Sequence, residues 1–469
     1  MSRNLAGLLE SALARNPHSI RSTDGEHLEP VTVRDAAARI AGALRDRDIA
    51  ADEPVLVAIR NRPADLAALH GAWLAGAVAV PIHASVAPAT ATSLREATGA
   101  RFRIDGDAVT GLAYGAPPAR PLLRGAALIV VTSGSTGRPK GLVLGHERLC
   151  GKLDVLGRLL RFRTEDAVVV PLRLTFIFGI WVSLLALVSA SALVLVPRFS
   201  PEAVAGALER DGTVLAAVPT MLRTMLDAPR PAPALRSILT GGEALGAALA
   251  GAIRGAFPSA GLYDLYGLTE TGSCDFCLAP SDQPAGDGSI GSPTEGVEFR
   301  LAAEHGGPVR DGAPGELRIR TPFGMLGYLD DPDSTRAAFG DGFFRTGDIA
   351  RRRPDGRIEL VGRSKEIISR GGNKISPLEL DNLLAGHPDV AAALCAGVPD
   401  GRLGEAIHAV VVLKPGAHLT TERLRDWAAA RTERFKLPDA IHFRDALPVG
   451  STGKASRAAV AEIVMRAKS

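Results

Sequence analysis

The chain is poor in cysteine, in aromatic residues and in lysine, and it lacks any long basic run. Its 469 residues include four cysteines, Cys150, Cys274, Cys277 and Cys395, too few for a disulfide framework. Cys274 and Cys277 form a CxxC, but no second pair exists to complete a zinc site. A net charge of +3, spread thinly, predicts no nucleic-acid partner, because binding the phosphate backbone needs clustered basic side chains.

The first 17 residues mix acidic and basic side chains in an amphipathic pattern and contain no apolar core segment. They predict no secretory signal, and with so few cysteines a cytoplasmic protein is expected. The chain is 46% hydrophobic and 22% charged, which is typical of a globular protein of two or more domains.

Helical and strand-like segments alternate from residue 32 onward. Segments 33–47 and 63–77 have apolar residues at helical spacing, whereas 54–59 and 78–83 are short buried-strand runs. Helices of this length between strands predict parallel sheets with crossovers.

The pattern of predicted helices and strands changes twice further along the chain. From about residue 288 short β runs with Gly and Pro turns replace the alternation, and after residue 363 a compact α+β segment follows. We therefore predict an α/β fold with a large N-terminal domain of layered α/β subdomains over 1–363. This domain includes a β-rich subdomain over about 288–363, and a small α+β C-terminal domain covers 364–469.

Residues 174–197 carry no charge and are long enough to span a bilayer. Gly179 and the Ser189-Ala190-Ser191 segment divide this run into a buried helix and a buried strand, which is the structure we expect. A span here would place the two halves of a continuous α/β pattern on opposite sides of a membrane. A membrane-embedded protein is the alternative.

The segment LIVVTSGSTGRPKG, at 128–141, joins a buried strand to a loop dense in hydrogen-bond donors. Glycines let the backbone turn its N–H groups inward, hydroxyls add donors, and the lysine adds a positive charge. The segment therefore predicts a phosphate-binding loop, but Pro139 before the lysine excludes a Walker A loop. The expected ATP-binding residues are Thr132, Ser133, Gly134, Ser135, Thr136, Gly137 and Lys140.

This segment resembles the signature of the adenylate-forming superfamily, which includes acyl- and aryl-CoA synthetases, peptide-synthetase adenylation domains and luciferases. Four further segments match in chain order, namely YGLTE at 266–270, GD at 347–348, GRSK at 362–365 and STGK at 451–454. The pattern around 173–179 is similar to benzoate-type CoA ligases.

The resemblance implies a role for each matched residue. Tyr266 would pack on the adenine, Thr269 would contact the α-phosphate, and Glu270 would hold Mg²⁺. Further implied ATP-site and catalytic residues are Asp348 and Arg363 at the ribose, Gly242, Glu243, and the catalytic Lys454.

The small C-terminal domain would rotate about a hinge at Lys365, and Gly371 and Gly372 would line the tunnel for the thiol. The implied acyl-site residues are Phe176, Gly241, Leu265 and Gly267, whereas we interpret Phe178 as core.

The implied reaction has two steps. A carboxylate attacks ATP to give an acyl-adenylate and pyrophosphate, and a thiol then displaces AMP. The first step needs no general base, because a carboxylic acid is already ionised at neutral pH. ATP, Mg²⁺ and CoA are the expected cofactors. The acyl region has no aspartate to hold an amino group, so α-amino acids are not the expected substrates. The likeness to benzoate-type CoA ligases implies an aromatic or compact hydrophobic acid.

The acceptor and the assembly state stay open. Residues 435–439 offer one lysine and one aspartate, where CoA-using relatives often place several basic residues. A carrier-protein phosphopantetheine is therefore an alternative acceptor, an inactive nucleotide-binding homologue is an alternative function, and a homodimer is one possible assembly.

Lysine is rare in an arginine-rich chain, so a retained lysine indicates where a compact ammonium is wanted. The eight lysines are Lys140, Lys152, Lys365, Lys374, Lys414, Lys436, Lys454 and Lys468. Three of them lie in the matched segments, and Lys374 lies in the segment IISRGGNKISPLELD at 367–381, which follows GRSK and extends the resemblance.

Overall fold

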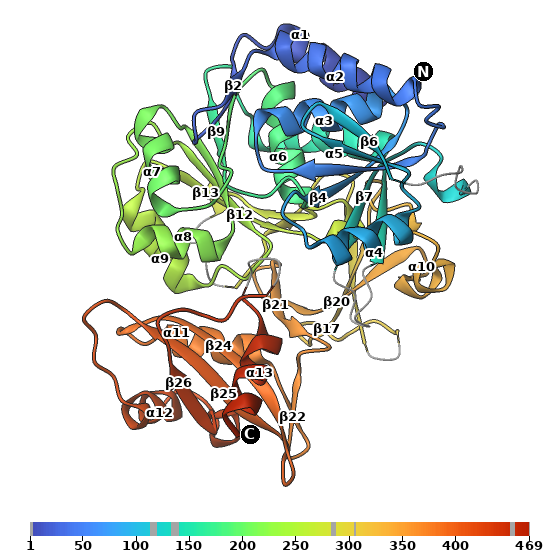
Figure 1. Cartoon of the computed structure of the whole chain (residues 1–469). Helices are drawn as coiled ribbons and strands as arrows, with labels where there is room; N and C mark the ends of the chain where they lie inside the picture. The colour runs from blue at the N-terminus through green and yellow to red at the C-terminus, as the bar shows by residue number, and fades with distance from the viewer. Residues whose placement is uncertain are drawn as a thin grey trace.

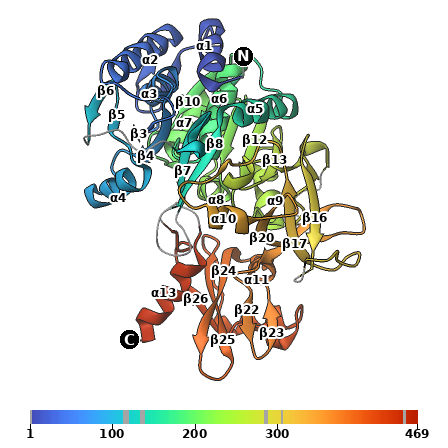
Figure 2. The same cartoon turned by 90° about the vertical axis from the view of Figure 1, so that its right-hand side faces the viewer.

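The computed structural model describes residues 3–112, 120–132, 140–282, 288–303, 306–450 and 455–468. Figure 1 shows the sheets of the larger, N-terminal part of the chain above a separate sheet formed by the C-terminal part, coloured orange to red. The turned view in Figure 2 shows the same separation, with β16, β17 and β20 lying next to the C-terminal sheet.

The middle of the chain forms a nine-stranded sheet whose central strands are parallel. Its central strands are runs of buried Val, Leu, Ile and Ala, as expected for parallel strands covered on both faces. In spatial order the strands are β15 (Ser292–Pro293), β14 (Phe276–Leu278), β13 (Gly261–Tyr266), β12 (Ser237–Gly241), β11 (Val214–Ala217), β9 (Ala167–Val170), β10 (Ala192–Leu195), β1 (Ile20–Ser22) and β2 (His27–Leu28). The helices of this region are α5 (His146–Leu160), α6 (Ile177–Val188), α7 (Pro201–Arg210), α8 (Pro219–Leu226) and α9 (Ala247–Ala256).

A seven-stranded sheet carries most of the N-terminal segments. In spatial order it contains β18 (Gly327–Tyr328), β8 (Lys140–Gly145), β7 (Ala126–Thr132), β4 (Val78–His83), β3 (Pro54–Ile59), β5 (Phe102–Asp105) and β6 (Ala108–Gly111). The helices before and between these strands are α1 (Leu5–Arg15), α2 (Pro30–Arg45), α3 (Pro63–Leu74) and α4 (Pro88–Thr98), with the 3-10 turn η1 (Pro121–Leu123). The expected parallel pairing of 54–59 with 78–83 is confirmed, whereas β8 runs antiparallel to β7.

Two smaller sheets follow. The first contains β16 (Glu298–Ala302), β17 (Gly315–Arg320), β20 (Phe343–Arg352) and β19 (Phe339–Gly340), with β21 (Ile358–Arg363) on β20 and the helix α10 (Pro332–Ala338) nearby. The second contains β23 (Asn373–Ile375), β22 (Ile368–Arg370), β25 (Gly404–Leu413) and β24 (Val390–Asp400), with β26 (Ala440–Phe443) on β25. Its helices are α11 (Pro377–Ala385), α12 (Thr421–Ala429) and α13 (Arg457–Lys468), and the remaining 3-10 turns are η2 (Thr269–Thr271), η3 (Pro280–Asp282) and η4 (Arg434–Lys436). Two strands from the β-rich region, β15 and β18, pair with the larger sheets instead.

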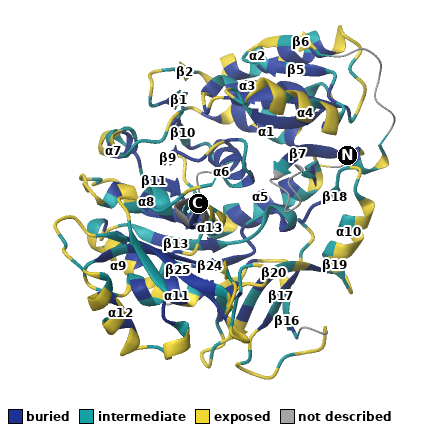
Figure 3. Cartoon of the chain, turned by 60° about the horizontal axis from the view of Figure 1, so that its bottom comes forward, coloured by how far each residue is buried: buried dark blue, intermediate teal, exposed yellow. Residues whose placement is uncertain are grey.

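The uncharged run at 174–197 folds as the helix α6 followed by the strand β10, as the sequence predicts. Most of its side chains are buried between the sheet and the neighbouring helices. No helix in the described part of the chain combines the length and the apolar character that crossing a membrane requires. Figure 3 shows buried residues along the strands and exposed residues on the outer helices α10 and α12.

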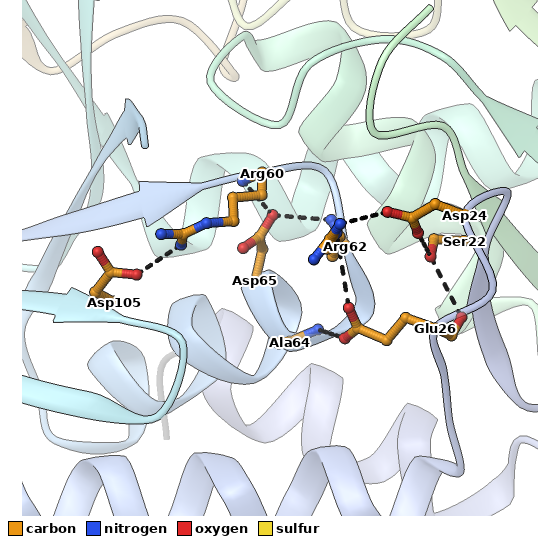
Figure 4. Close-up of polar contacts among 8 residues, drawn as sticks. All are labelled: Ser22, Asp24, Glu26, Arg60, Arg62, Ala64, Asp65 and Asp105. Carbon is orange, nitrogen blue, oxygen red and sulfur yellow. Dashed lines mark hydrogen bonds and ion pairs between the residues drawn. The ribbon is translucent and has the colours of Figure 1, made fainter. Parts of the chain in front are cut away.

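A polar network fixes the turn between β3 and α3 (Figure 4). The backbone N–H groups of Arg60 and Arg62 donate to the buried Asp65 carboxylate at 2.7 Å and 3.0 Å. Burial raises the pKa of Asp65 to about 6, against the lowering effect of these backbone donors. The Arg60 side chain binds Asp105 on β5, and that of Arg62 binds Asp24 in the β1–β2 turn. The network therefore ties two sheets together beside the carboxyl end of β3.

The tight start of α6 generates a stability prediction. A Cβ added to Gly179 would lie 2.5 Å from the carbonyl oxygen of Arg173, so Gly179→Ala should lower the free energy of unfolding by roughly 1–3 kcal/mol. Gly206 in α7 has nothing within 4 Å of an added Cβ, so Gly206→Ala should be stabilising by about 0.5–1 kcal/mol. Urea unfolding of both variants checks this; an undisturbed Gly179→Ala would mean that α6 does not begin against residues 172–173.

Candidate functional site

Three side chains from separate strands meet at one point, two from the ends of β13 and β21 and one from the middle of β20. Tyr266 is the last residue of β13, and its hydroxyl donates to Asp348 Oδ2 at 2.6 Å. Arg363 is the last residue of β21 and the antiparallel partner of Asp348, and its Nε donates to Asp348 Oδ1 at 2.8 Å. Asp348 is only 3% exposed, whereas the Arg363 side chain is 58% exposed. The buried carboxylate thus holds a tyrosine ring and a solvent-facing guanidinium around one point.

The electrostatics of these three groups agree with that geometry. Burial, followed by the facing Asp348 carboxylate, raises the pKa of Tyr266 well above its ordinary value, so the phenol stays protonated and donates. The Asp348 carboxylate also raises the pKa of Arg363. A carboxylate can accept about four hydrogen bonds and these partners use two, so Asp348 retains acceptor capacity for a ligand diol.

The turn after β13 carries the second part of the site. Thr269 and Glu270 lie half-buried in η2, and Glu270 Oε1 accepts a hydrogen bond from the hydroxyl of Tyr328 at 3.3 Å. The Lys140 Nζ lies 5.2 Å from the centroid of the Tyr328 ring, and Lys140 is the register partner of Thr132 at the end of β7. A series of contacts therefore connects the end of β7 and the start of β8 with the turn at Glu270.

Lys140 is held by the start of α10. Its Nζ donates to Ser334 Oγ at 2.7 Å and lies 3.3 Å from Asp331 Oδ2. The structure thus places the expected phosphate-binding lysine beside an acidic N-cap residue. Its role toward phosphate stays a prediction.

Glycines bring two strand ends into close backbone contact. A Cβ on Gly241 would lie 2.3 Å from the carbonyl oxygen of its register partner Leu265, and a Cβ on Gly267 would lie 2.3 Å from the Cys274 nitrogen. Neither position has room for a side chain. The expected acyl-site residues of β12 and β13 therefore form a wall in which backbone packs against backbone.

Glu243, an expected ATP contact, turns one carboxylate oxygen toward α8. Its Oε2 accepts from the Thr220 hydroxyl at 2.6 Å and from the Thr220 backbone N–H at 3.2 Å, in the first turn of that helix. Gly242, with φ +83°, is exposed beside it. The carboxylate of Glu243 therefore supports α8, and its role toward ATP stays a prediction.

The two phenylalanines at the start of α6 have different surroundings. Phe178 packs against the main core cluster and stacks on Trp181 with ring centroids 5.2 Å apart, as expected of a core residue. Phe176 is the N-cap residue of α6, is half-buried, and is a member of none of the core clusters formed by the described residues. This placement leaves Phe176 available to line a site.

Several predicted residues lie elsewhere. Lys365 is exposed directly after Ser364, whose N–H donates to the Gly347 carbonyl at 2.8 Å. Gly371 and Gly372 are exposed in the turn between β22 and β23, with φ +55° and +82°. Thr132 ends β7, and nothing is described of its side chain. The remaining predicted residues lie outside the described part of the chain: Ser133, Gly134, Ser135, Thr136, Gly137 and Lys454.

Sequence reasoning missed one residue that contacts the site, Tyr328, and one titratable residue beside it, Asp264. Tyr328 bridges Glu270 and Lys140, and its signal was weak, namely one of only four tyrosines in the chain. Asp264 lies two residues before Tyr266 on the same face of β13, and burial raises its pKa to about 7. An aspartate in a strand two residues before an implied adenine contact was the available signal.

Family models match most of the chain. The model described as AMP-binding enzyme matches residues 10–113 and 105–329. The model described as AMP-binding enzyme C-terminal domain matches residues 379–454. The first model covers the turn at Glu270, and the second model covers β24, β25 and β26 of the C-terminal sheet.

Individual proteins are similar over comparable lengths. Feruloyl-CoA synthase from Amycolatopsis is 33% identical over 446 residues, which is 89% of this chain and 90% of that protein. Against Probable CoA ligase CCL9 of Humulus lupulus the identity is 34%, and the match spans 71% of this chain but 65% of that protein. The crystal structure of a benzoate CoA ligase from Burkholderia xenovorans LB400 is 25% identical, with a TM-score of 0.86 and coverage of 97% and 99% of the two chains.

The raised pKa of Asp264 generates a pH prediction. A carboxyl group that ionises near pH 7 when folded and near pH 4 when unfolded binds its proton better in the folded state. Its contribution to stability is therefore present below about pH 4 and is lost as the pH rises through about 7. Asp264→Asn should be more stable than the natural protein by roughly 1–3 kcal/mol at pH 8, with the difference vanishing toward pH 4.

Urea unfolding between pH 4 and pH 8 measures this difference. Asp311→Asn, at an exposed turn residue, is the control for the removal of one carboxylate from the surface. A constant offset for Asp264→Asn would show that its carboxyl group ionises alike in both states.

Proposed function

This chain belongs to the AMP-binding, adenylate-forming enzyme family, as an acid–CoA ligase of the AMP-forming type, and from that premise we propose its substrates. It activates an aromatic or other compact hydrophobic carboxylic acid with ATP, releases pyrophosphate, and transfers the acyl group to CoA. The observation that carries this proposal is the buried Asp348 carboxylate, which joins Tyr266 and Arg363 next to the turn of Glu270.

ATP would bind along this line of residues. Asp348 has acceptor capacity for the two ribose hydroxyls, and the exposed Arg363 guanidinium supplies positive charge beside them. Tyr266 is fixed by its hydroxyl, so its ring offers a surface of fixed orientation for the adenine. Thr269 and the loop after Thr132 would bind the phosphates.

Glu270 fits a magnesium ligand. Its carboxylate is half-buried, and the Tyr328 hydroxyl binds Oε1 at 3.3 Å, which leaves Oε2 as the oxygen for a hard cation. When bound, Mg²⁺ would offset the negative charge of the phosphates. Lys454, implied by the sequence resemblance alone, would stabilise the charge that develops as the acid attacks.

The acid would lie between α6 and the ends of β12 and β13. Phe176 at the start of α6 is half-buried, and Gly241 and Gly267 leave no room for a side chain at the strand ends, whereas the Leu265 side chain packs in the main core cluster. An aromatic side chain beside bare backbone favours a compact hydrophobic acid.

A second acceptor is favoured by one observation in the C-terminal sheet. The single lysine of residues 435–439, Lys436, lies 2.7 Å from Glu379 and 3.1 Å from Glu433, so two carboxylates offset its charge. Asp439 in the same stretch pairs with Arg370. Residues 435–439 therefore offer little net positive charge for the 3′-phosphate of CoA, and a carrier-protein phosphopantetheine lacks that group.

The decisive experiment is a panel of carboxylic acids read by ATP-dependent pyrophosphate release, with CoA or a phosphopantetheinylated carrier protein as acceptor. We expect release with aromatic or compact hydrophobic acids, and product formation with CoA. Lys454→Ala should reduce release on the order of a hundred- to thousandfold, with ATP binding and melting temperature nearly unchanged. Pyrophosphate release with none of the acids would reject the proposed function, and product formation with the carrier alone would replace CoA by the second acceptor.

The place of Phe176 predicts a change of substrate preference. Phe176→Ala should open space beside the acid and shift preference toward bulkier acids by a graded amount, worth about 1–3 kcal/mol. The acid panel and the melting temperature, measured on one preparation, check this. If Phe176 only packs, the truncation should instead cost roughly 3–5 kcal/mol of stability with the ranking of acids preserved.

A further inference from the structure

Lys152 is a buried lysine that the proposed function does not use. It lies on α5, and its side chain is 1% exposed in a chain that otherwise carries its basic charge mostly on arginine. A buried ammonium requires partners, because removing a charge from water is costly unless it is paired and hydrogen-bonded. Its partners therefore indicate what it holds.

Those partners belong to the segment directly after the YGLTE motif. The Lys152 Nζ donates to the Cys274 carbonyl at 2.7 Å and lies 3.9 Å from Asp275 Oδ1. The Asp275 side chain is fully buried, and its other oxygen accepts a hydrogen bond from the Thr271 hydroxyl. The ammonium also lies 5.4 Å from the centroid of the Phe323 ring.

The segment that Lys152 binds has an unusual backbone. Gly272, Ser273 and Cys274 have φ values of +84°, +69° and +50° in succession, although side chains disfavour this region. Such a conformation persists only where the surroundings fix it. The turn is closed by hydrogen bonds from the N–H of Gly272 to the Thr269 carbonyl at 3.2 Å and from that of Ser273 to the Leu268 carbonyl at 2.8 Å.

The same helix also holds the loop on the other side of Glu270. Arg148 precedes Lys152 by four residues on α5, so the two lie on one face of the helix. Arg148 donates to the carbonyls of Gly324 at 2.8 Å and Met325 at 2.5 Å, and the Met325 N–H donates to the Glu270 carbonyl at 2.7 Å. Two cationic side chains of α5 thus bind the two segments that lie on either side of Glu270, Arg148 the one at 324–325 and Lys152 the one at 274–275.

We propose that Lys152, with Asp275, is a positioning residue that sets Thr269 and Glu270 for binding magnesium and phosphate. The inference rests on the proposed function, because it assigns a support to that site. Lys152 touches no substrate in this arrangement. It acts through the Cys274 carbonyl and the strained turn.

The test uses the full chain and measures the Mg²⁺ concentration for half-maximal pyrophosphate release. Lys152→Met removes the charge at similar length, and we expect this concentration to rise about 10–100-fold, the range typical of residues that orient metal ligands. Glu270→Gln is the reference and should give a shift in the same direction.

A double variant separates positioning from stability. Lys152→Met leaves Asp275 as an unpaired buried charge, so its melting temperature should fall. Lys152→Met with Asp275→Asn removes that charge and should recover the melting temperature. The shifted Mg²⁺ requirement should remain, because the Cys274 carbonyl still lacks the Lys152 donor and keeps only the Thr294 hydroxyl at 3.0 Å. A recovery of both properties would assign the pair a structural role only, and the double variant decides the question if the single variant does not fold.

A matched control lies at the amino ends of the strands of the nine-stranded sheet, where Asp166 precedes β9 and Arg236 precedes β12. Arg236 Nε donates to Asp166 Oδ1 at 2.7 Å, and the Asp166 side chain is 2% exposed. Asp166→Asn should lower the melting temperature and leave the Mg²⁺ titration unchanged. A natural protein that releases no pyrophosphate would reject the proposed function itself. An active natural protein with an unchanged titration in folded Lys152→Met would reject only the positioning inference.

Discussion

The buried carboxylate of Asp348 is the constraint on which the arrangement of the site depends. It lies on β20, and its two oxygens bind the last residues of β13 and β21, so it fixes the nine-stranded sheet to the small β sheet. A buried charge left with one partner would be costly, which makes both contacts necessary together. Tyr266 therefore cannot move independently of Arg363, and the turn that follows Tyr266 begins at a residue whose position is fixed.

The fold was predictable where its pattern is local. The strands at 54–59 and 78–83 and the division of 174–197 into α6 and β10 follow from periodicity and turn residues over short windows. The pairings within the site were not predictable in this way. Tyr328 meets Glu270 across 58 residues, and Lys140 meets Ser334 across 194, and no local pattern encodes a contact at such separation. The matched motifs named the residues but not the side chains that hold them.

Lysine usage illustrates how composition carried information that only the structure could interpret. Lys140 lies between the Tyr328 ring and α10, Lys152 lies between α5 and the turn at Cys274, and Lys436 lies between two carboxylates. Each ammonium occupies a position bounded on several sides, where a planar guanidinium needs more room. The rarity of lysine indicated special positions, but it could not distinguish a phosphate ligand from a support. Lys152 was the least conspicuous of them in sequence and is the most deeply buried.

The connection to the C-terminal sheet combines contacts that could stay fixed with one contact that a rotation would have to break. Before the predicted hinge, Ser364 is tied to Gly347, and Arg363 is tied to Asp348, so the chain up to that point belongs to the site. After it, the Ser376 hydroxyl donates to the Val361 carbonyl and joins α11 to β21. A rotation at the exposed Lys365 would have to break the Ser376 contact but could leave both earlier contacts intact. The Asp348 carboxylate would then stay in place while the C-terminal sheet turned, which would let the proposed nucleotide site serve both proposed steps without rearranging.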